Sequence, residues 1–214
     1  MIHVYTHPGT RGTRATWALE EAGATYDIAI VDLMKGEGRS REYLGINPGG
    51  KVPAMIADGL YLSESGAICN WVGEHFPDSG LTPPSGTRER ALYDRWCFFV
   101  VTELEQPLWT MAKHRFALPE KRRVPEIMET ASWEFANALS VLAGALQDVP
   151  YLVGDRFTAA DLLAAHTLAW ARRYEMPLND RYITAYTDAQ LSRPALARAG
   201  PGAGGQGRDR PETG

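Results

Sequence analysis

The pattern of apolar and polar positions divides the chain into a mixed first part and a helical second part. Ile2–Tyr5 and Tyr26–Val31 carry the short apolar patterns of β-strands, and a helical pattern between them ends at Gly23. A strand–helix–strand unit of this length predicts two parallel strands joined by a right-handed crossover.

A second set of short elements follows the second strand. Asp58-Gly59, between two apolar runs, is the dipeptide type that most strongly indicates a β-hairpin. The turn INPGG ends a short helical pattern before it, and a longer helical pattern comes after it. The predicted elements are a helix over 39–45, strands Ala54–Ala57 and Leu60–Leu62, and a helix from Glu64 or Ser65 to His75.

Beyond residue 86 only helical periodicity remains. Residues 77–86, rich in proline and glycine, are typical of a linker between domains. Thr158 and Asp161 resemble a capping box, with Asp161 in place of the usual glutamate, and the helix after them is apolar on nearly every face. Two earlier helices each present one apolar face, through Leu92, Trp96, Phe99, Val100, Leu104 and Leu108 and through Ile127, Ala131, Phe135, Ala138, Leu139, Leu142 and Leu146.

The composition is that of a globular protein with an ample core. Hydrophobic residues make up 44% and charged residues 22% of the 214 residues, and the formal net charge is −4. A net negative chain offers no general attraction for nucleic acid, and without a run of eighteen apolar residues we expect no membrane span. The first residues lack the layout of a secretory signal, so we expect a cytoplasmic protein.

The cysteines and histidines show no spacing that indicates special chemistry. Cys69 and Cys97 match no metal or redox motif and lie within apolar helical patterns, which predicts core packing in a reducing compartment. The histidines show no metal-ligand spacing, so we expect no metal. Residues 199–214 contain six glycines, two prolines and no large apolar side chain, which predicts a disordered tail without function.

Three motifs occur in an order that is typical of one family: INPGGKVPAM, LSESGAI and GDRFTAADLLAA. With Val-Pro heading the third strand and Glu-Ser opening the helix after the hairpin, residues 1–198 resemble the glutathione transferase family in its bacterial-type cytosolic form. The resemblance implies a homodimer. It also implies a thioredoxin-like α/β domain of βαβ–ββα order over 1–76, a linker over 77–86 and an all-α domain over 87–198.

The resemblance further implies a binding site for glutathione as co-substrate, without a metal. A cis Val52–Pro53 bond would turn the N–H and C=O of Val52 toward the cysteinyl backbone of glutathione, as an added strand pairs with a sheet edge. The Ser65 hydroxyl and the first N–H groups of its helix would bind the γ-glutamyl carboxylate. Without the hairpin between them, Pro53 would indicate only the stop of an edge strand and Ser65 only a helix cap.

Three charged residues complete the implied binding set. Glu64 would take the γ-glutamyl ammonium group, or would be only a favourable charge in the first helical turn. Lys35 and Lys51 would approach the glycyl carboxylate of glutathione, or would be solvated surface lysines. The sequence alone leaves these alternatives open.

Activation of the glutathione thiol has several candidates within YTHPGTRGTR, residues 5–14. A thiol with a pKa of about 8.5 is mostly protonated at pH 7, so an enzyme has to stabilise the thiolate. Thr10 is the nearest hydroxyl to the activating position of the family, and Arg11 and the helix N-terminus would add positive charge. Tyr5 and Thr13 are weaker candidates, and a purely structural Thr10 in the loop is the alternative.

The resemblance implies a detoxification enzyme, a glutathione transferase that ionises glutathione and conjugates its thiolate to a small hydrophobic electrophile. Trp109, Met111, Arg115 and Phe116 would line an apolar pocket for this electrophile, although aromatic residues on a helix usually belong to a core. The alternatives are a glutathione-dependent peroxidase or disulfide reductase, and a non-catalytic interaction protein of the same fold. The presence of Lys51, Val52-Pro53 and Glu64-Ser65 together favours ligand binding, because a pure scaffold would not require them.

Overall fold

The computed structural model describes residues 1–199. Four short strands form one mixed sheet in the order β2-β1-β3-β4. β1 and β2 run parallel, as the strand–helix–strand pattern predicts, and β3 pairs antiparallel with both β1 and β4. The strands are β1 (Ile2–Thr6), β2 (Tyr26–Ile30), β3 (Ala54–Ala57) and β4 (Leu60–Ser63).

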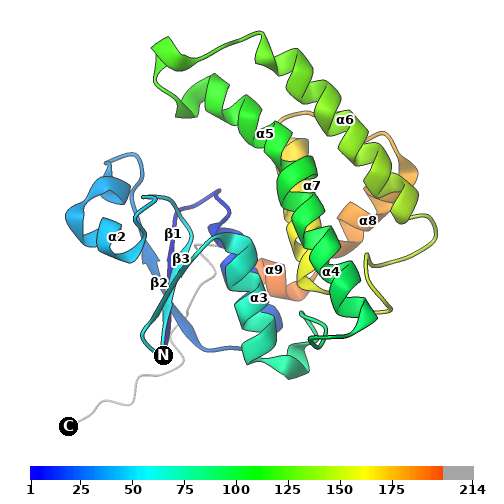
Figure 1. Ribbon diagram of the computed structural model, residues 1–214, viewed down its shortest axis with the longest axis horizontal. Helices are drawn as coiled ribbons and strands as arrows, with labels where there is room; N and C mark the ends of the chain where they lie inside the picture. The colour runs from blue at the N-terminus through cyan, green and yellow to red at the C-terminus, as the bar shows by residue number, and fades with distance from the viewer. Residues whose placement is uncertain (200–214) are drawn as a thin grey trace. The chain divides into compact units, whose positions relative to one another are not determined.

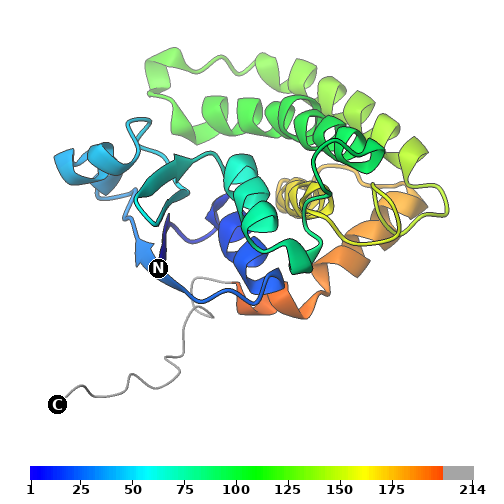
Figure 2. The ribbon, with the colours of Figure 1, turned by 60° about the horizontal axis from the view of Figure 1, so that its bottom comes forward.

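The chain forms two compact units. The first contains residues 1–81 and the C-terminal segment from Arg193, and the second contains Thr82–Ser192. In the first unit, Figures 1 and 2 place α2 on one side of the sheet and α3 on the other. The helices of the first unit are α1 (Gly12–Glu21), α2 (Arg41–Ile46), α3 (Ser65–His75) and α9 (Pro194–Arg198), with 3₁₀ turns at Glu37–Arg39 and Pro77–Ser79.

The β3–β4 hairpin turns at Asp58-Gly59, as predicted. Both residues have a positive φ, 50° at Asp58 and 83° at Gly59, which a type I′ turn requires. The hairpin pairs Ala54 with Ser63 at its open end. The residues just before β3 therefore lie beside the residues just after β4.

The two faces of the sheet have separate cores. Successive side chains of a strand point to opposite faces, so Val4 and Met55 lie on one face and Tyr5 and Ala54 on the other. Val4 and Met55 are fully buried, and α1 and α3 pack against each other and against the strands. The core on the other face contains Tyr43 of α2 together with Tyr5, Val31, Leu33, Ile46, Val52 and Ala54.

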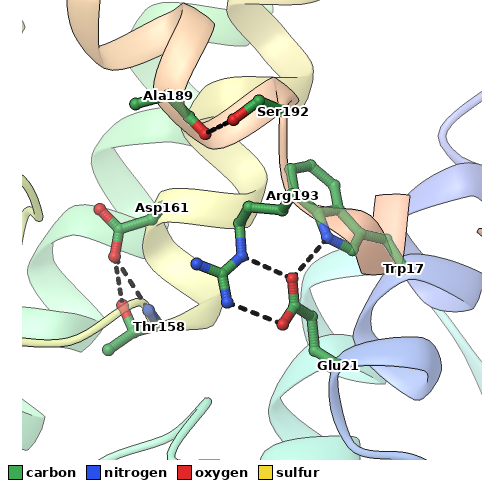
Figure 3. Close-up of polar contacts among 7 residues, drawn as sticks. All are labelled: Trp17, Glu21, Thr158, Asp161, Ala189, Ser192 and Arg193. Carbon is green, nitrogen blue, oxygen red and sulfur yellow. Dashed lines mark hydrogen bonds and ion pairs between the residues drawn. The ribbon is translucent and has the colours of Figure 1, made fainter. Parts of the chain in front are cut away.

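The C-terminal segment returns to the first unit and packs on α1. The carboxylate of Glu21 accepts two hydrogen bonds from Arg193, at 2.6 and 2.8 Å, and a third from the indole N–H of Trp17 (Figure 3). Arg198 forms a second ion pair, at 2.8 Å, with Glu20. Two acidic residues of α1 thus hold the segment that contains α9.

This return of the chain was not predicted from the sequence, which assigned 87–198 to the helical domain. Ala199, predicted as the first residue of a disordered tail, is instead buried, and its carbonyl accepts the Thr16 hydroxyl at 2.7 Å. The rest of that tail, 200–214, lies outside the described residues. Helical periodicity indicates that a short segment is helical but not which unit it packs against.

The second unit is helical throughout, which confirms the predicted fold class. Its central helix is α7, which packs against α4, α5 and α8 and is buried at every position from Ala159 to Leu168. The helices are α4 (Arg88–Phe99), α5 (Glu105–Ala112), α6 (Ile127–Ala145), α7 (Ala159–Arg173) and α8 (Arg181–Leu191), with π-helical turns at Val100–Leu104 and Lys113–Ala117 and a 3₁₀ turn at Glu120–Arg122.

The apolar stripe predicted after the linker runs through the first π-helical turn. Trp96, Val100, Leu104 and Leu108 are buried at steps of four residues. An α-helix has about 3.6 residues per turn, so such a row drifts by about 40° per step, and a π turn corrects the drift by adding a residue. The prediction is wrong for Leu92, which is 36% exposed one α-helical turn before Trp96.

The start of α7 is a capping box, as predicted. One carboxylate oxygen of Asp161 accepts the backbone N–H and the hydroxyl of Thr158, and the other accepts the Leu152 N–H and the Tyr186 hydroxyl. Burial raises the pKa of Asp161, and the four donors oppose that rise. Asp161 therefore has a structural role at the start of the central helix.

Three further predictions from the sequence concern the cysteines, metal binding and membrane spans. Cys69 and Cys97 are both buried, as expected of core residues. Among residues 1–199, no three side chains of the types that bind metals gather at one point. No helix in this part of the chain is long and apolar enough to cross a membrane.

Candidate functional site

The predicted site residues meet at one end of the sheet. β3 is antiparallel to β1 and to β4, so the end of β1, the start of β3 and the end of β4 lie together. β2 is parallel to β1, so the loop after β2 leaves from the same end. The residues concerned are Thr10 and Arg11 after β1, Lys35 after β2, Lys51, Val52 and Pro53 before β3, and Glu64 and Ser65 after β4.

The segment before β3 is fixed by side chains from α2 and the turn that follows it. The Val52–Pro53 peptide bond is cis, and both residues are buried. Just before them, the carbonyl of Lys51 accepts the Tyr43 hydroxyl at 2.6 Å and the Asn47 amide at 2.7 Å. Burial raises the pKa of Tyr43 to about 12, so its hydroxyl stays protonated and donates at neutral pH.

Two glycines bring the loop after β2 against the loop before β3. A Cβ on Gly38 would lie 2.8 Å from the carbonyl oxygen of Gly50, and a Cβ on Gly50 would lie 2.6 Å from that of Gly38. Gly50 also has a φ of 61°, which glycine adopts without steric cost. The two backbones therefore touch, and a larger residue at either position would push them apart.

The start of α3 has an unusual backbone conformation. Glu64 precedes the helix with a φ of 68° and a ψ of 113°, and a non-glycine residue in such a region costs of the order of 1–3 kcal/mol. Its side chain is exposed, whereas Ser65, the next residue, is buried. β4 thus ends and α3 begins within one residue, and the first N–H groups of α3 lie at this end of the sheet.

The Ser65 hydroxyl is joined to α1 by a buried arginine. Arg14 is 0% exposed, and its Nη1 donates to Ser65 Oγ at 3.3 Å. One turn further along α3, the Cys69 thiol donates to the Arg14 carbonyl at 3.5 Å. Side-chain and backbone groups of Arg14 therefore both contact α3.

The Thr10 hydroxyl is engaged within its own loop. Oγ1 donates to the His7 carbonyl at 2.6 Å and accepts the Gly12 N–H at 3.2 Å. His7 Nδ1 lies 2.9 Å from the Val31 carbonyl, and because a carbonyl only accepts, Nδ1 carries the proton. The single proton of the Thr10 hydroxyl is thus directed at a backbone carbonyl.

The beginning of α1 lies close against β1. A Cβ on Gly12 would come within 1.7 Å of the Thr6 hydroxyl oxygen, so only glycine lets the helix start here. Arg11, just before the helix, is half-buried, and the first turn of α1 holds no acidic residue. The positive end of the helix dipole is therefore not neutralised by a carboxylate in that turn.

Lys35 has a carboxylate partner in its own loop. Its ammonium group forms an ion pair with Asp32 at 3.2 Å. Asp32 also accepts the backbone N–H groups of Met34 and Lys35. The Lys35 backbone N–H, and after it the Lys35 side chain, lowers the pKa of Asp32, so this carboxylate is ionised at neutral pH. A bound carboxylate would have to compete with Asp32 for Lys35.

The two weaker candidates for thiol activation lie on different elements. Tyr5 is half-buried on the α2 face of the sheet, where its ring centroid is 5.9 Å from that of Tyr43. Thr13 is half-buried in the first turn of α1.

The four residues predicted to line an electrophile pocket all belong to the second unit. Met111 is buried, with its sulfur 3.9 Å from the Ser132 hydroxyl, so it is a core residue of that unit. The Arg115 guanidinium lies over the Tyr174 ring at 5.2 Å. Phe116 is exposed and Trp109 is half-buried.

Sequence reasoning missed three residues that position this end of the sheet: Arg14, Tyr43 and Asn47. Arg14 precedes Trp17 and Ala18 by three and four residues, on the face of α1 that is buried, so a charge on an apolar helix face was the available signal. Tyr43 and Asn47 offered no comparable signal, because their shared partner is a backbone carbonyl in the following loop.

Comparison with known proteins covers most of the chain. Residues 1–74 match the family model for the glutathione S-transferase N-terminal domain, and residues 106–194 match the model for its C-terminal domain. Glutathione S-transferase GstA of Escherichia coli O157:H7 is 28% identical over 201 residues, which cover 92% of this chain and 96% of the relative.

Two further proteins extend the comparison. Disulfide-bond oxidoreductase YfcG of Escherichia coli strain K12 is 34% identical over 181 residues, 81% of this chain and 82% of the relative. The crystal structure of glutathione transferase URE2P6 from Phanerochaete chrysosporium, in complex with oxidized glutathione, is 26% identical with a TM-score of 0.83 and covers 92% of this chain and 94% of that one. With both family models matched, the chain belongs to the glutathione S-transferase family.

Proposed function

We propose that this protein is a glutathione transferase that binds glutathione at the end of the sheet described above and directs its thiolate at a small hydrophobic electrophile. The observation that carries the proposal is the meeting of three segments at that end: the loop before α1, the Val52–Pro53 turn and the start of α3. Family membership and the glutathione complex of URE2P6 support the same ligand.

Each part of the tripeptide has a proposed partner. Val52 pairs with the cysteinyl backbone, since backbone donors and acceptors beside a sheet edge recognise an extended peptide. Ser65 and the N-terminus of α3 bind the γ-glutamyl carboxylate, and Glu64 binds the neighbouring ammonium group. Lys51 and Lys35 bind the glycyl carboxylate, Lys35 by exchanging it for Asp32.

The thiolate is proposed to lie near the start of α1, stabilised by Thr10, Arg11 and the helix dipole. Thr10 donates to the His7 carbonyl in this structure, so its hydroxyl has to turn to reach a sulfur. An anionic acceptor makes a hydrogen bond roughly twice as strong as a neutral one, which favours that turn once the thiolate is present. Arg11 is proposed to contribute positive charge from the residue just before the helix.

A second function, the glutathione-dependent reduction of a disulfide, is favoured by the match to the disulfide-bond oxidoreductase YfcG. In that reaction the glutathione thiolate attacks one sulfur of a disulfide, forms a mixed disulfide with it and expels the other sulfur as a thiolate. A second glutathione then releases the first thiol and leaves oxidised glutathione. Both cysteines of this chain are buried, so bound glutathione itself would supply the nucleophile.

We also propose a cytoplasmic homodimer with a role in detoxification. The second unit has a hollow of about 340 Å³ lined by Phe99, Gln106, Trp133 and Val141 among others. Trp133 is 66% exposed and Val141 50% exposed. Large exposed apolar side chains around a hollow are typical of protein–protein interfaces, and a second copy of the chain is the proposed occupant.

One set of assays tests the proposed glutathione binding and the two proposed activities. Calorimetric titration with reduced glutathione should show binding at micromolar to millimolar concentration. Turnover is then compared for an aryl halide, an alkyl hydroperoxide and a small dialkyl disulfide, each with glutathione. Faster turnover of the aryl halide supports the transferase, and faster turnover of the disulfide supports the reductase. Binding without turnover of any of the three would support a non-catalytic interaction protein. Absence of glutathione binding would contradict both the transferase and the reductase.

A further inference from the structure

The contact between Arg14 and Ser65 restricts what the Ser65 hydroxyl can do. A guanidinium group only donates hydrogen bonds, whereas a hydroxyl has one proton and two acceptor lone pairs. Ser65 Oγ therefore accepts from Arg14 Nη1 at 3.3 Å. The single Ser65 proton remains for a different partner, which has to be an acceptor.

Two buried threonines of this chain use their hydroxyl proton within their own helix. Thr167 donates to the Leu163 carbonyl at 2.8 Å, and Thr187 donates to the Ile183 carbonyl at 2.6 Å. Each acceptor lies four residues earlier in the same helix. Ser65 is the first residue of α3, so the carbonyl four residues before it belongs to β4 and not to a helical turn.

The location of Arg14 adds a positive charge to the same place. Arg14 is fully buried in α1, and a guanidinium stays ionised in proteins. Its side chain reaches the start of α3, where the helix dipole is also positive. Both contributions favour an anion beside Ser65.

We propose that Arg14 is a positioning residue for carboxylate binding, which holds the Ser65 hydroxyl as a donor toward the γ-glutamyl carboxylate of glutathione. Hydrogen bonds in a chain polarise one another, so the bond from Arg14 also strengthens Ser65 as a donor. This inference rests on the proposed function, because it assigns the carboxylate of glutathione to Ser65. It adds a residue that acts through Ser65 from inside the protein.

The test compares two ligands that differ at one group. 4-Aminobutyryl-cysteinyl-glycine is glutathione without the γ-glutamyl α-carboxylate. Both are titrated calorimetrically into the full chain and into Arg14→Met, Arg14→Lys, Ser65→Ala and the Arg14→Met/Ser65→Ala double variant. Far-ultraviolet circular dichroism of each variant without ligand reports whether it is folded.

For Arg14→Met, glutathione affinity should fall about tenfold, the equivalent of one lost charge-assisted hydrogen bond, and affinity for the analogue should stay within about twofold. Arg14→Lys keeps a donor and a charge and should lose less. In the double variant, Arg14→Met should add little to the loss from Ser65→Ala, because both act on one interaction. The KM for glutathione should rise, while kcat and the pKa of the bound thiol stay unchanged.

Two results would overturn the proposal and leave the proposed function intact. Equal losses for glutathione and the analogue would mean that Arg14 does not act through the carboxylate. If Arg14→Met and Arg14→Lys are both unfolded without ligand, Arg14 is a folding residue. If the wild-type chain binds neither ligand, the proposed function fails, and the role of Arg14 fails with it.

Discussion

At the scale of the residue, two hydroxyls at the same end of the sheet differ in whether their proton is available to a ligand. Thr10 has its proton directed at the His7 carbonyl, and Ser65 has a lone pair occupied by Arg14. Ser65 can therefore donate to a ligand without rearrangement, whereas Thr10 has to turn first. In the sequence, both residues are hydroxyls before or at the start of a helix. Nothing in the sequence indicates which of the two uses its proton within the protein.

Replacement of Thr10 tests whether it stabilises the thiolate. Thr10→Val keeps the side-chain shape and removes the hydroxyl, so the pKa of the thiol of bound glutathione should rise and turnover at pH 7 should fall. Affinity for glutathione should change less than turnover. The ultraviolet absorbance of the thiolate, followed against pH, measures this pKa.

Thr10→Ser is the matched control, because it keeps the hydroxyl and should leave the titration in place. If Thr10→Val behaves like wild type and Arg11→Ala or Tyr5→Phe moves the titration, thiol activation belongs to one of those residues. An unchanged titration in all of these variants would leave the α1 dipole and backbone as the activating groups.

The Cys69 thiol should be unreactive in the folded protein. Burial raises its pKa to about 12, and the nearby Arg14 charge opposes the rise. At pH 8 a Cys97→Ser variant, with Cys69 as its one thiol, should react with iodoacetamide far more slowly when folded than in urea. Equal rates would show that Cys69 is accessible.

The same shift has a consequence for stability. The folded state holds the Cys69 proton more tightly than the unfolded state, whose thiol has a pKa near 9.0. This contribution to the free energy of unfolding is present below pH 9 and is lost as the pH rises from 9 toward 12. Cys69→Ala should flatten this part of the curve of melting temperature against pH, compared with wild type.

At the scale of the element, α2 acts through the loop that it supports. Tyr43 anchors α2 in the core of its sheet face and donates to Lys51, one residue before Val52. Asn47 donates to the same carbonyl from the turn after the helix. A short helix of six residues thereby fixes the peptide that is proposed to pair with glutathione.

Removal of the Tyr43 hydroxyl tests this support. Tyr43→Phe keeps the ring in the core and deletes one of two donors to the Lys51 carbonyl. The free energy of unfolding should fall by about 1 kcal/mol, since Asn47 still satisfies the carbonyl, and glutathione affinity should fall several-fold. Tyr61→Phe, with an exposed ring on β4, is the control and should change neither quantity. Equal affinities for Tyr43→Phe and wild type would contradict the positioning role.

Helices and strands could be predicted where neighbouring residues carry the sequence signal for them. Contacts between residues far apart in the sequence could not be predicted. Asp58-Gly59 carries its own turn chemistry, and Thr158 and Asp161 carry their own cap, so the hairpin and α7 followed from the sequence. The bond from Arg14 to Ser65 joins residues 51 positions apart, and no local pattern indicates it. The arrangement of the candidate site at one end of the sheet was predictable, and its buried supporting residues were not.

The segment around α9 should stabilise the first unit. Deletion of 200–214 leaves every described contact in place, so its melting temperature should equal that of the full chain. Deletion of 193–214 removes the bidentate pair between Arg193 and Glu21 and leaves this carboxylate with fewer donors. The melting temperature should then fall by several degrees. Equal values for the two truncations would show that α9 contributes nothing.

At the scale of the whole molecule, the prediction concerns assembly. If a second copy covers the hollow in the second unit, light scattering at micromolar concentration should give about 47 kDa, twice the 23.6 kDa of one chain. Trp133→Glu places a charge among the exposed apolar side chains of the hollow and should shift the mass toward the monomer. Glu89→Gln, an exposed change at the start of α4, is the control. A monomeric wild type would exclude the proposed dimer.

The ion pair between Arg193 and Glu21 joins the C-terminal segment to the first unit, which is therefore discontinuous in sequence. This discontinuity has a consequence for synthesis on the ribosome. Residues 1–81 leave the ribosome long before Arg193 is translated, and the whole second unit is made in between. The nascent first unit therefore waits for its last segment until nearly the entire chain has emerged. A ribosome-bound chain stalled before Arg193 should be cleaved by protease at α1 faster than the released protein.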